Sequence, residues 1–306
     1  MDIFSILTMI GGLALFLYGM QVMGDGLKKA SGGKLETILE KLTSNKMMAV
    51  LLGAGVTAVI QSSSATTVMV VGFVNSGIMK LSQAVGVILG ANVGATLTAW
   101  LLSLTGVEGS NFFLQLLKPS SFSPILAITG VIILAMSKRE RQKDVASIMI
   151  GFAVLMFGMD AMSGAVEPLA DMPEFTHILL VFSNPVLGML VGLVITAVIQ
   201  SSGASIGILQ ALCVSGIVNY STAIPIIMGQ NVGTCVTALL SSVGASKNAR
   251  RAALIHLYYN IIKTVAFMAV FYTLNAIFHF SFMDKPIPAL GVAFIHTAFN
   301  IVAVVI

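Results

Sequence analysis

The chain has 306 residues, of which 57% are hydrophobic and only 9% are charged, and its formal net charge is +4. Soluble domains carry about 25% charged residues, so this composition excludes an ordinary water-soluble fold. The few basic residues also give no sign of a nucleic-acid partner. Because backbone groups in lipid must find hydrogen-bond partners within their own segment, we expect an all-α polytopic protein embedded in a lipid bilayer.

The first apolar segment, residues 4–23, is long enough to cross about 30 Å of hydrocarbon. It has neither a basic region before it nor a clear small-residue cleavage site after it, so we do not expect it to be a cleaved signal peptide. The segment is predicted to remain as a membrane helix.

The strongest internal signal is a duplication. Thr57–Ser63 recurs as Thr196–Ser202, a shift of 200 − 61 = 139 residues, and the same shift aligns about 12–99 with the second half without a gap. Such self-similarity indicates a repeated structural unit. The predicted division of the chain is a first repeat at 1–136, a basic cytoplasmic linker at 137–144, a second repeat at 145–280, and a terminal transmembrane helix at 281–306.

Each copy contains interrupted apolar runs. Residues 47–79 and 186–218 each hold two runs, broken at Gln-Ser-Ser, that are too short to cross the bilayer as straight helices, so each is predicted to form a re-entrant hairpin. Residues 81–106 and 222–243 are each predicted to be one crossing broken near an Asn, where glycines permit a turn. Paired interrupted segments in two halves are typical of a transporter binding site.

Basic residues give the orientation, because short cytoplasmic loops concentrate Lys and Arg. Placing the end of the first helix inside puts Lys138, Arg139, Arg141 and Lys143 in the cytoplasm, and leaves the loop 164–184 outside with three acids and no base. We therefore predict a multi-pass protein of the plasma (inner) membrane with its N-terminus outside. Three crossings separate the starts of the two copies, so the repeats are predicted to be inverted, with their Gln-Ser-Ser tips meeting near the midplane.

Two polar clusters lie inside these apolar stretches. Hydroxyl and amide groups are costly in hydrocarbon unless they find partners, and hydrogen bonds between helices are the simpler explanation for a lone Ser. For two matched clusters we favour a binding site, in which N–H and O–H donors suit an oxyanion. The predicted substrate-binding residues are Gln61, Ser62, Ser63, Ser64, Gln200, Ser201, Ser202, Asn92 and Asn231.

Neutral oxygens in the same regions suit Na⁺, the only coupling ion or cofactor that we expect. The Na⁺ candidates are Thr66, Thr67, Thr98, Ser205, Thr234, Thr237 and Asn260. Since neither motif contains a basic residue, the charge of an anion would be balanced by bound cations and by helix N-termini.

Several other polar residues receive a structural interpretation. His256 and Asn260, like His296 and Asn300, are spaced i, i+4 and are predicted to make interhelical contacts, with cation coordination by Asn260 as the alternative. Lys263 is interpreted as a side chain that snorkels near a helix end. The two cysteines, Cys213 and Cys235, are predicted to be small buried hydrophobes.

The stretch 203–207 fits the G-x-S-x-G pattern of hydrolases. No strand is expected before it, and no Asp joins the few His residues in a triad-like arrangement. We therefore expect no enzyme activity.

The duplicated Gln-Ser-Ser element, followed about thirty residues later by Gly-x-Asn-Val-Gly (Gly90–Gly94 and Gly229–Gly233), resembles the type II sodium-dependent phosphate cotransporters, which have bacterial members. The resemblance implies Na⁺ influx coupled to phosphate uptake by alternating access, with Gln61–Ser64 and Gln200–Ser202 lining the site. It also implies a homodimer and a soluble regulatory domain beyond residue 306. The alternatives are a sodium-coupled carrier of another small anion, such as sulfate or a carboxylate, and a passive anion channel.

Overall fold

The computed structural model describes residues 3–30, 45–104, 119–166 and 182–305. The helices in these ranges are α1 (Ile3–Ala30), α3 (Lys46–Ile60), α4 (Ser63–Asn75), α5 (Leu81–Gly94), α6 (Thr96–Ser103), α8 (Pro119–Met136), α9 (Glu140–Val166), α11 (Pro185–Ile199), α12 (Ser202–Val214), α13 (Tyr220–Gly233), α14 (Cys235–Ser241), α15 (Lys247–Phe278) and α16 (Ala289–Val305). Within these ranges no β-strand forms, and five helical stretches are long and apolar enough to cross a membrane. The predicted all-α membrane architecture is confirmed at this level.

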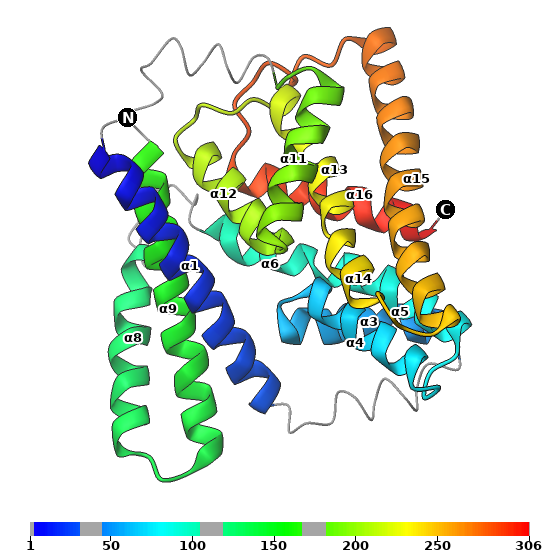
Figure 1. Ribbon diagram of the computed structural model, residues 1–306. Helices are drawn as coiled ribbons and strands as arrows, with labels where there is room; N and C mark the ends of the chain where they lie inside the picture. The colour runs from blue at the N-terminus through cyan, green and yellow to red at the C-terminus, as the bar shows by residue number, and fades with distance from the viewer. Residues whose placement is uncertain (1–2, 31–44, 105–118, 167–181, 306) are drawn as a thin grey trace.

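Helices α1, α8 and α9 form a bundle on one side of the molecule (Figure 1). The helices α1 and α9 run antiparallel and touch backbone to backbone: a Cβ added at Gly19 would lie 2.7 Å from the Gly151 carbonyl oxygen, and one at Gly158 would lie 2.6 Å from that of Gly12. The 139-residue shift relates Gly12 to Gly151 and Gly19 to Gly158. Each copy therefore supplies the same two glycines to one reciprocal seam, and close helix packing explains why they are small.

Helices α3 and α5 pack in parallel, as the order of their contacts along the chain shows. Gly90 lies against Val50, and Gly94, one turn later, lies against Ala54. Because α4 joins the end of α3 to the start of α5, it must lead back toward the start of α3. Helices α3 and α4 therefore form a hairpin with its tip at Gln61.

The second copy repeats this arrangement with α11, α12 and α13. Gly229 lies against Met189, and Gly233 lies against Leu193, so α11 and α13 are also parallel. Figure 1 shows the two groups of helices facing one another, with the long helix α15 along one side of both.

The predicted break near Asn92 and Asn231 occurs three residues further along the chain, but its predicted cause is wrong. Both residues lie inside a helix, where their amides donate to the carbonyls of Ile88 and Ile227 at 3.2 and 2.8 Å and cap no helix. The interruption comes at Ala95 and Thr234, which both keep helical backbone angles. The glycines around Asn92 and Asn231 permit close packing against α3 and α11 and form no turn.

Two predicted boundaries also shift. Helix α9 begins at Glu140, so the predicted linker 137–144 shrinks to three residues, and the final helix begins only at Ala289, so residues 281–288 lie outside it. Most of the predicted outer loop 164–184 lies outside the described residues.

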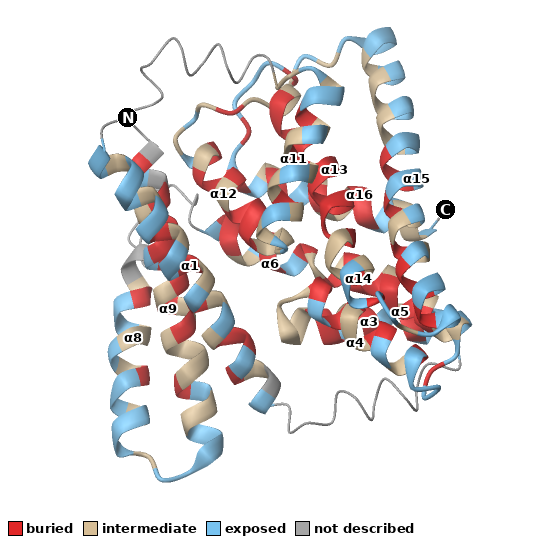
Figure 2. Cartoon of the chain, viewed as in Figure 1, coloured by how far each residue is buried: buried red, intermediate tan, exposed pale blue. Residues whose placement is uncertain are grey.

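Exposed residues line the outer faces of α1, α8 and α15 (Figure 2), and many of them are large and hydrophobic. Leu7, Ile128 and Ile262 are each about 60% exposed there. Such an apolar exterior suits a lipid solvent, while the buried polar side chains lie in the interior between the helices.

Candidate functional site

Each Gln-Ser-Ser tip is built by a left-handed glutamine and a capping serine. Gln61 and Gln200 both have φ of +57°, a region in which non-glycine residues are uncommon and are often found at functional sites. The next residue is extended, and its hydroxyl accepts the amide N–H of the helix that follows: Ser62 from Ala65 at 3.1 Å, and Ser201 from Ala204 at 3.2 Å. The tips are thus the N-termini of α4 and α12.

The two tips meet. The hydroxyl oxygens of Ser63 and Ser202, which the duplication relates to each other, lie 3.5 Å apart. The first amide N–H groups of a helix have no acceptor within it, and they carry the positive end of the helix dipole. Two such positive ends facing each other favour an anion between them.

A small cavity lies between the tips. It is lined by Gln61, Ser62, Ser63, Ser64, Ala95, Thr98, Ser201, Ser202 and Gly203 and measures about 10 Å³, room for about one water molecule. Six of the nine predicted substrate-binding residues line it, whereas Gln200, Asn92 and Asn231 do not. Ala95 and Gly203 were missed because neither carries a polar side chain, although both adjoin the repeated motifs.

Comparison with known proteins now agrees with the geometry. A family model described as Na⁺/Pi-cotransporter matches residues 15–164 and again 154–295, one match on each copy. The chain belongs to the Na⁺/Pi-cotransporter family. This membership confirms the resemblance found in the sequence and, because the family is one of transporters, the expectation that the chain is not an enzyme.

Three relatives illustrate the range of this transporter family. The chain is 27% identical to the putative inorganic phosphate export protein YjbB of Salmonella typhimurium, in an alignment that covers 86% of this chain and 46% of YjbB. It is 29% identical to the uncharacterized protein YqeW of Bacillus subtilis, in an alignment that covers 95% of this chain and 89% of YqeW. It is 33% identical to sodium-dependent phosphate transport protein 2A of Rattus norvegicus over 31% of this chain and 15% of that protein. The chain spans about half the length of YjbB, and no solved structure matches it.

Hydroxyl pairs tie together the two arms of each hairpin in this family member. Thr57 donates to the Thr66 oxygen at 3.0 Å, and Thr196 donates to the Ser205 oxygen at 2.8 Å. Among the other Na⁺ candidates, Thr67 donates to the Ser63 carbonyl at 2.9 Å, which leaves its oxygen lone pairs available as acceptors. Thr234 likewise donates to the Asn231 carbonyl at 2.7 Å.

The two copies differ at one pair of candidates. Thr98 donates to the side-chain oxygen of Gln61 at 3.0 Å and lines the cavity. The equivalent Thr237 has a buried hydroxyl with no partner among the described residues, while Gln200 is exposed. The glutamine at the first tip is therefore hydrogen-bonded to α6, and no equivalent bond joins Gln200 to Thr237 among the described residues.

The interpretation of Lys263 as a snorkelling side chain is wrong. Lys263 lies near the middle of the 32-residue helix α15, is 6% exposed, and donates to Asn300 of α16 at 2.7 Å and to Asn231 of α13 at 3.3 Å. The predicted interhelical contact is thereby confirmed for Asn300. Asn260 and Asn300 also each donate to a carbonyl of their own helix, that of His256 at 2.8 Å and that of His296 at 2.9 Å. The two cysteines are free and buried, as predicted.

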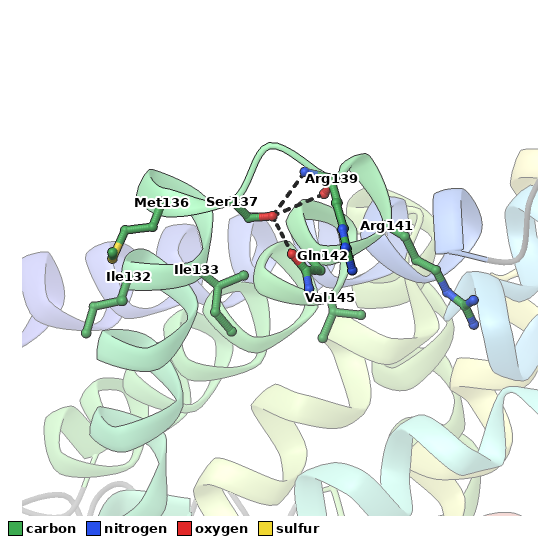
Figure 3. Close-up of a pocket in the computed structure, with 8 residues that line it drawn as sticks. All are labelled: Ile132, Ile133, Met136, Ser137, Arg139, Arg141, Gln142 and Val145. Carbon is green, nitrogen blue, oxygen red and sulfur yellow. Dashed lines mark hydrogen bonds between the residues drawn. The ribbon is translucent and has the colours of Figure 1, made fainter.

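A larger hollow lies at the exposed turn between α8 and α9, away from the tips. Figure 3 shows Arg139 and Arg141 at its rim, with the Ser137 hydroxyl donating to the Gln142 side-chain oxygen at 2.6 Å. None of the predicted site residues lines this hollow, so the cavity between the tips remains the candidate site.

Proposed function

We propose that this protein is a secondary active symporter that couples Na⁺ to inorganic phosphate and binds phosphate between its two Gln-Ser-Ser tips. The observation that carries the proposal is the contact of Ser63 with Ser202, because it brings two helix N-termini from the two copies to one point. Amide N–H and serine O–H donors around that point match the oxygens of phosphate.

Charge balance supports the coupling to Na⁺. None of the residues lining the cavity is basic, so the negative charge of phosphate has only helix N-termini and bound cations to offset it. Thr66, Thr67, Thr98, Ser205, Thr234, Thr237 and Asn260 are the proposed sources of oxygen ligands for Na⁺. An anion that needs a cation beside it binds weakly alone, and this dependence links the two solutes.

The size of the cavity supports alternating access. A volume of about 10 Å³ cannot hold phosphate, so the tips must separate to admit it. The reciprocal antiparallel seam of α1 and α9 supports inverted repeats. We therefore propose that the hairpins are re-entrant, that they approach from opposite faces of the plasma membrane, and that the N-terminus lies outside.

Phosphate export is the second candidate for the direction of transport, and it rests on the printed name of YjbB. In a symporter the Na⁺ gradient sets the direction of net flux. An inward Na⁺ gradient predicts uptake, whereas export requires an outward gradient or another driving force.

Proteoliposomes provide the test, loaded without phosphate for the uptake measurements and with radiolabelled phosphate for the efflux measurement. An inward Na⁺ gradient should concentrate radiolabelled phosphate, an equal K⁺ gradient should not, and a reversed Na⁺ gradient should drive efflux. Uptake that ignores Na⁺ would reject the symport, and flux that never exceeds equilibration would indicate a channel. Competition by sulfate or a carboxylate stronger than that by phosphate would assign another anion.

The site itself is tested in the same vesicles. Ser63→Ala and Ser202→Ala each remove a donor from the cavity, and each should raise the half-saturating phosphate concentration about tenfold, equivalent to about 1.4 kcal/mol. Ser76→Ala, at the exposed far end of α4, is the matched control and should behave as the native chain. Normal values in both site variants would place the phosphate elsewhere.

A further inference from the structure

Four buried asparagines share one conformation. In each, the side-chain amide donates to the backbone carbonyl four residues earlier, at distances from 2.8 to 3.2 Å; the four are Asn92, Asn231, Asn260 and Asn300. This bond fixes the amide group, so its oxygen is left to accept from outside the helix. The fold thereby provides several oriented, neutral oxygen ligands in its interior.

Two of these oxygens are used by one cation. The Lys263 ammonium lies 2.7 Å from the Asn300 oxygen and 3.3 Å from the Asn231 oxygen, at the place where α13, α15 and α16 meet (Figure 1). The rings of Phe299 and Tyr259 stand 4.9 and 5.1 Å from it, within the range of cation–π attraction.

No acid offsets this charge in the described part of the chain, where the ion pair found is Lys143 with Glu140 on the surface. A buried cation usually has a carboxylate partner, because removing a charge from water is costly. Lys263 instead has amide oxygens and ring faces, which are the ligands that hold a monovalent cation in a neutral site.

We propose that the Lys263 ammonium is a tethered cation that fills a Na⁺-type site formed by the side-chain oxygens of Asn231 and Asn300. In the native chain this site takes up no Na⁺. The inference rests on the proposed function only in taking Na⁺ as the ion that such a site would otherwise bind.

The other two asparagines, Asn92 and Asn260, differ from Asn231 and Asn300 because no lysine occupies their side-chain oxygens among the described residues. The Asn260 oxygen is buried without a partner among the described residues, and no lysine or arginine donates to Asn92 there. These oxygens remain available to a mobile ion. The protein therefore binds one Na⁺ fewer than its set of oriented asparagines would otherwise allow.

Equilibrium binding of radiolabelled Na⁺ to the purified full chain in detergent tests the inference. Lys263→Ala opens the site, and Lys263→Asn adds a third amide oxygen while leaving room for an ion. Each should bind one more Na⁺ per chain than the native protein. The matched control is Lys285→Ala at an exposed lysine, which should leave the number unchanged.

Thermal unfolding gives a second measurement on the same samples. Lys263→Ala should have a lowered melting temperature that Na⁺ or propylammonium partly restores and that bulky choline does not. If the alanine variant purifies only when Na⁺ or propylammonium is present, that result also supports the tethered cation.

An unchanged Na⁺ count in both Lys263 variants, with no selective restoration of melting, overturns the inference. The proposed function fails separately: a native chain that binds Na⁺ but does not move phosphate contradicts symport and leaves the Na⁺ count at Lys263 to decide this site.

Discussion

The hydroxyls of Thr98 and Thr237 occupy equivalent positions in the two copies. In the described part of the chain that of Thr98 has a partner, the Gln61 side chain, and that of Thr237 has none. Removing a hydroxyl that makes a hydrogen bond costs stability, whereas removing a buried hydroxyl without a partner is neutral or favourable.

Valine replaces the hydroxyl with a methyl group of similar size, so this pair of positions offers a matched comparison. Thr98→Val should lower the free energy of unfolding by about 1 kcal/mol, and Thr237→Val should leave it unchanged or raise it. Thermal unfolding of the purified variants measures both. Equal losses would mean that Thr237 has a partner in solution.

Among single residues, the sequence predicts the site residues that belong to a repeated motif. Gln61–Ser64 and Ser201–Ser202 stood out because a polar motif occurs twice in apolar surroundings, and they line the cavity. The environment of Lys263 could not be predicted, because its partners Asn231 and Asn300 lie more than thirty residues away in each direction.

Among the elements, glycines decide how closely the helices pack. A Cβ at Gly90 would overlap the Val50 carbonyl oxygen of α3, whereas a Cβ at Gly55, also in α3, meets nothing within 4 Å. Backbone atoms cannot move aside as a flexible side chain can, so overpacking at Gly90 should be costly.

Gly90→Ala should therefore lower the free energy of unfolding by about 1–3 kcal/mol or more. Gly55→Ala should be neutral or stabilising by up to about 1 kcal/mol, because alanine favours the helix. Denaturation of the two variants side by side checks this. A tolerated Gly90→Ala would show that α3 and α5 are not held at this distance.

Glycines of this kind also explain why the sequence analysis wrongly predicted a turn at 90–94. Gly90-Ala-Asn-Val-Gly94 reads like a turn, because glycine and asparagine are typical of turns, but close packing of parallel helices selects small residues equally well. A turn and a close helix contact can be distinguished only when the position of the neighbouring helix is known. The hairpins, by contrast, followed from the lengths of their apolar runs: the 15 residues of α3 reach only about 22 Å.

Across the whole molecule, the proposed inversion of the two copies makes a prediction that can be tested without measuring transport. Ser76 and Ser215 follow α4 and α12 at the open ends of the two hairpins, at equivalent positions. If the hairpins enter from opposite faces, Ser76 lies on the cytoplasmic side and Ser215 on the outside.

Single Ser76→Cys and Ser215→Cys variants, made in a chain whose two buried cysteines are alanine, can be labelled in intact cells with a membrane-impermeant thiol reagent. Ser215→Cys should react and Ser76→Cys should react only after the cells are opened. Reaction of both from the same side would contradict inverted repeats.

The reciprocal glycine seam between α1 and α9 bears on the origin of the chain. Because each copy offers the same two glycines and receives the same two in return, the seam is self-complementary, as in a two-fold dimer interface. A half-length ancestor could pair with an antiparallel copy of itself through this surface. Fusion of two such genes would then preserve the interface while freeing each half to diverge. Lys263 illustrates this divergence, as does Thr237, whose hydroxyl has no partner in the ranges that the structure describes.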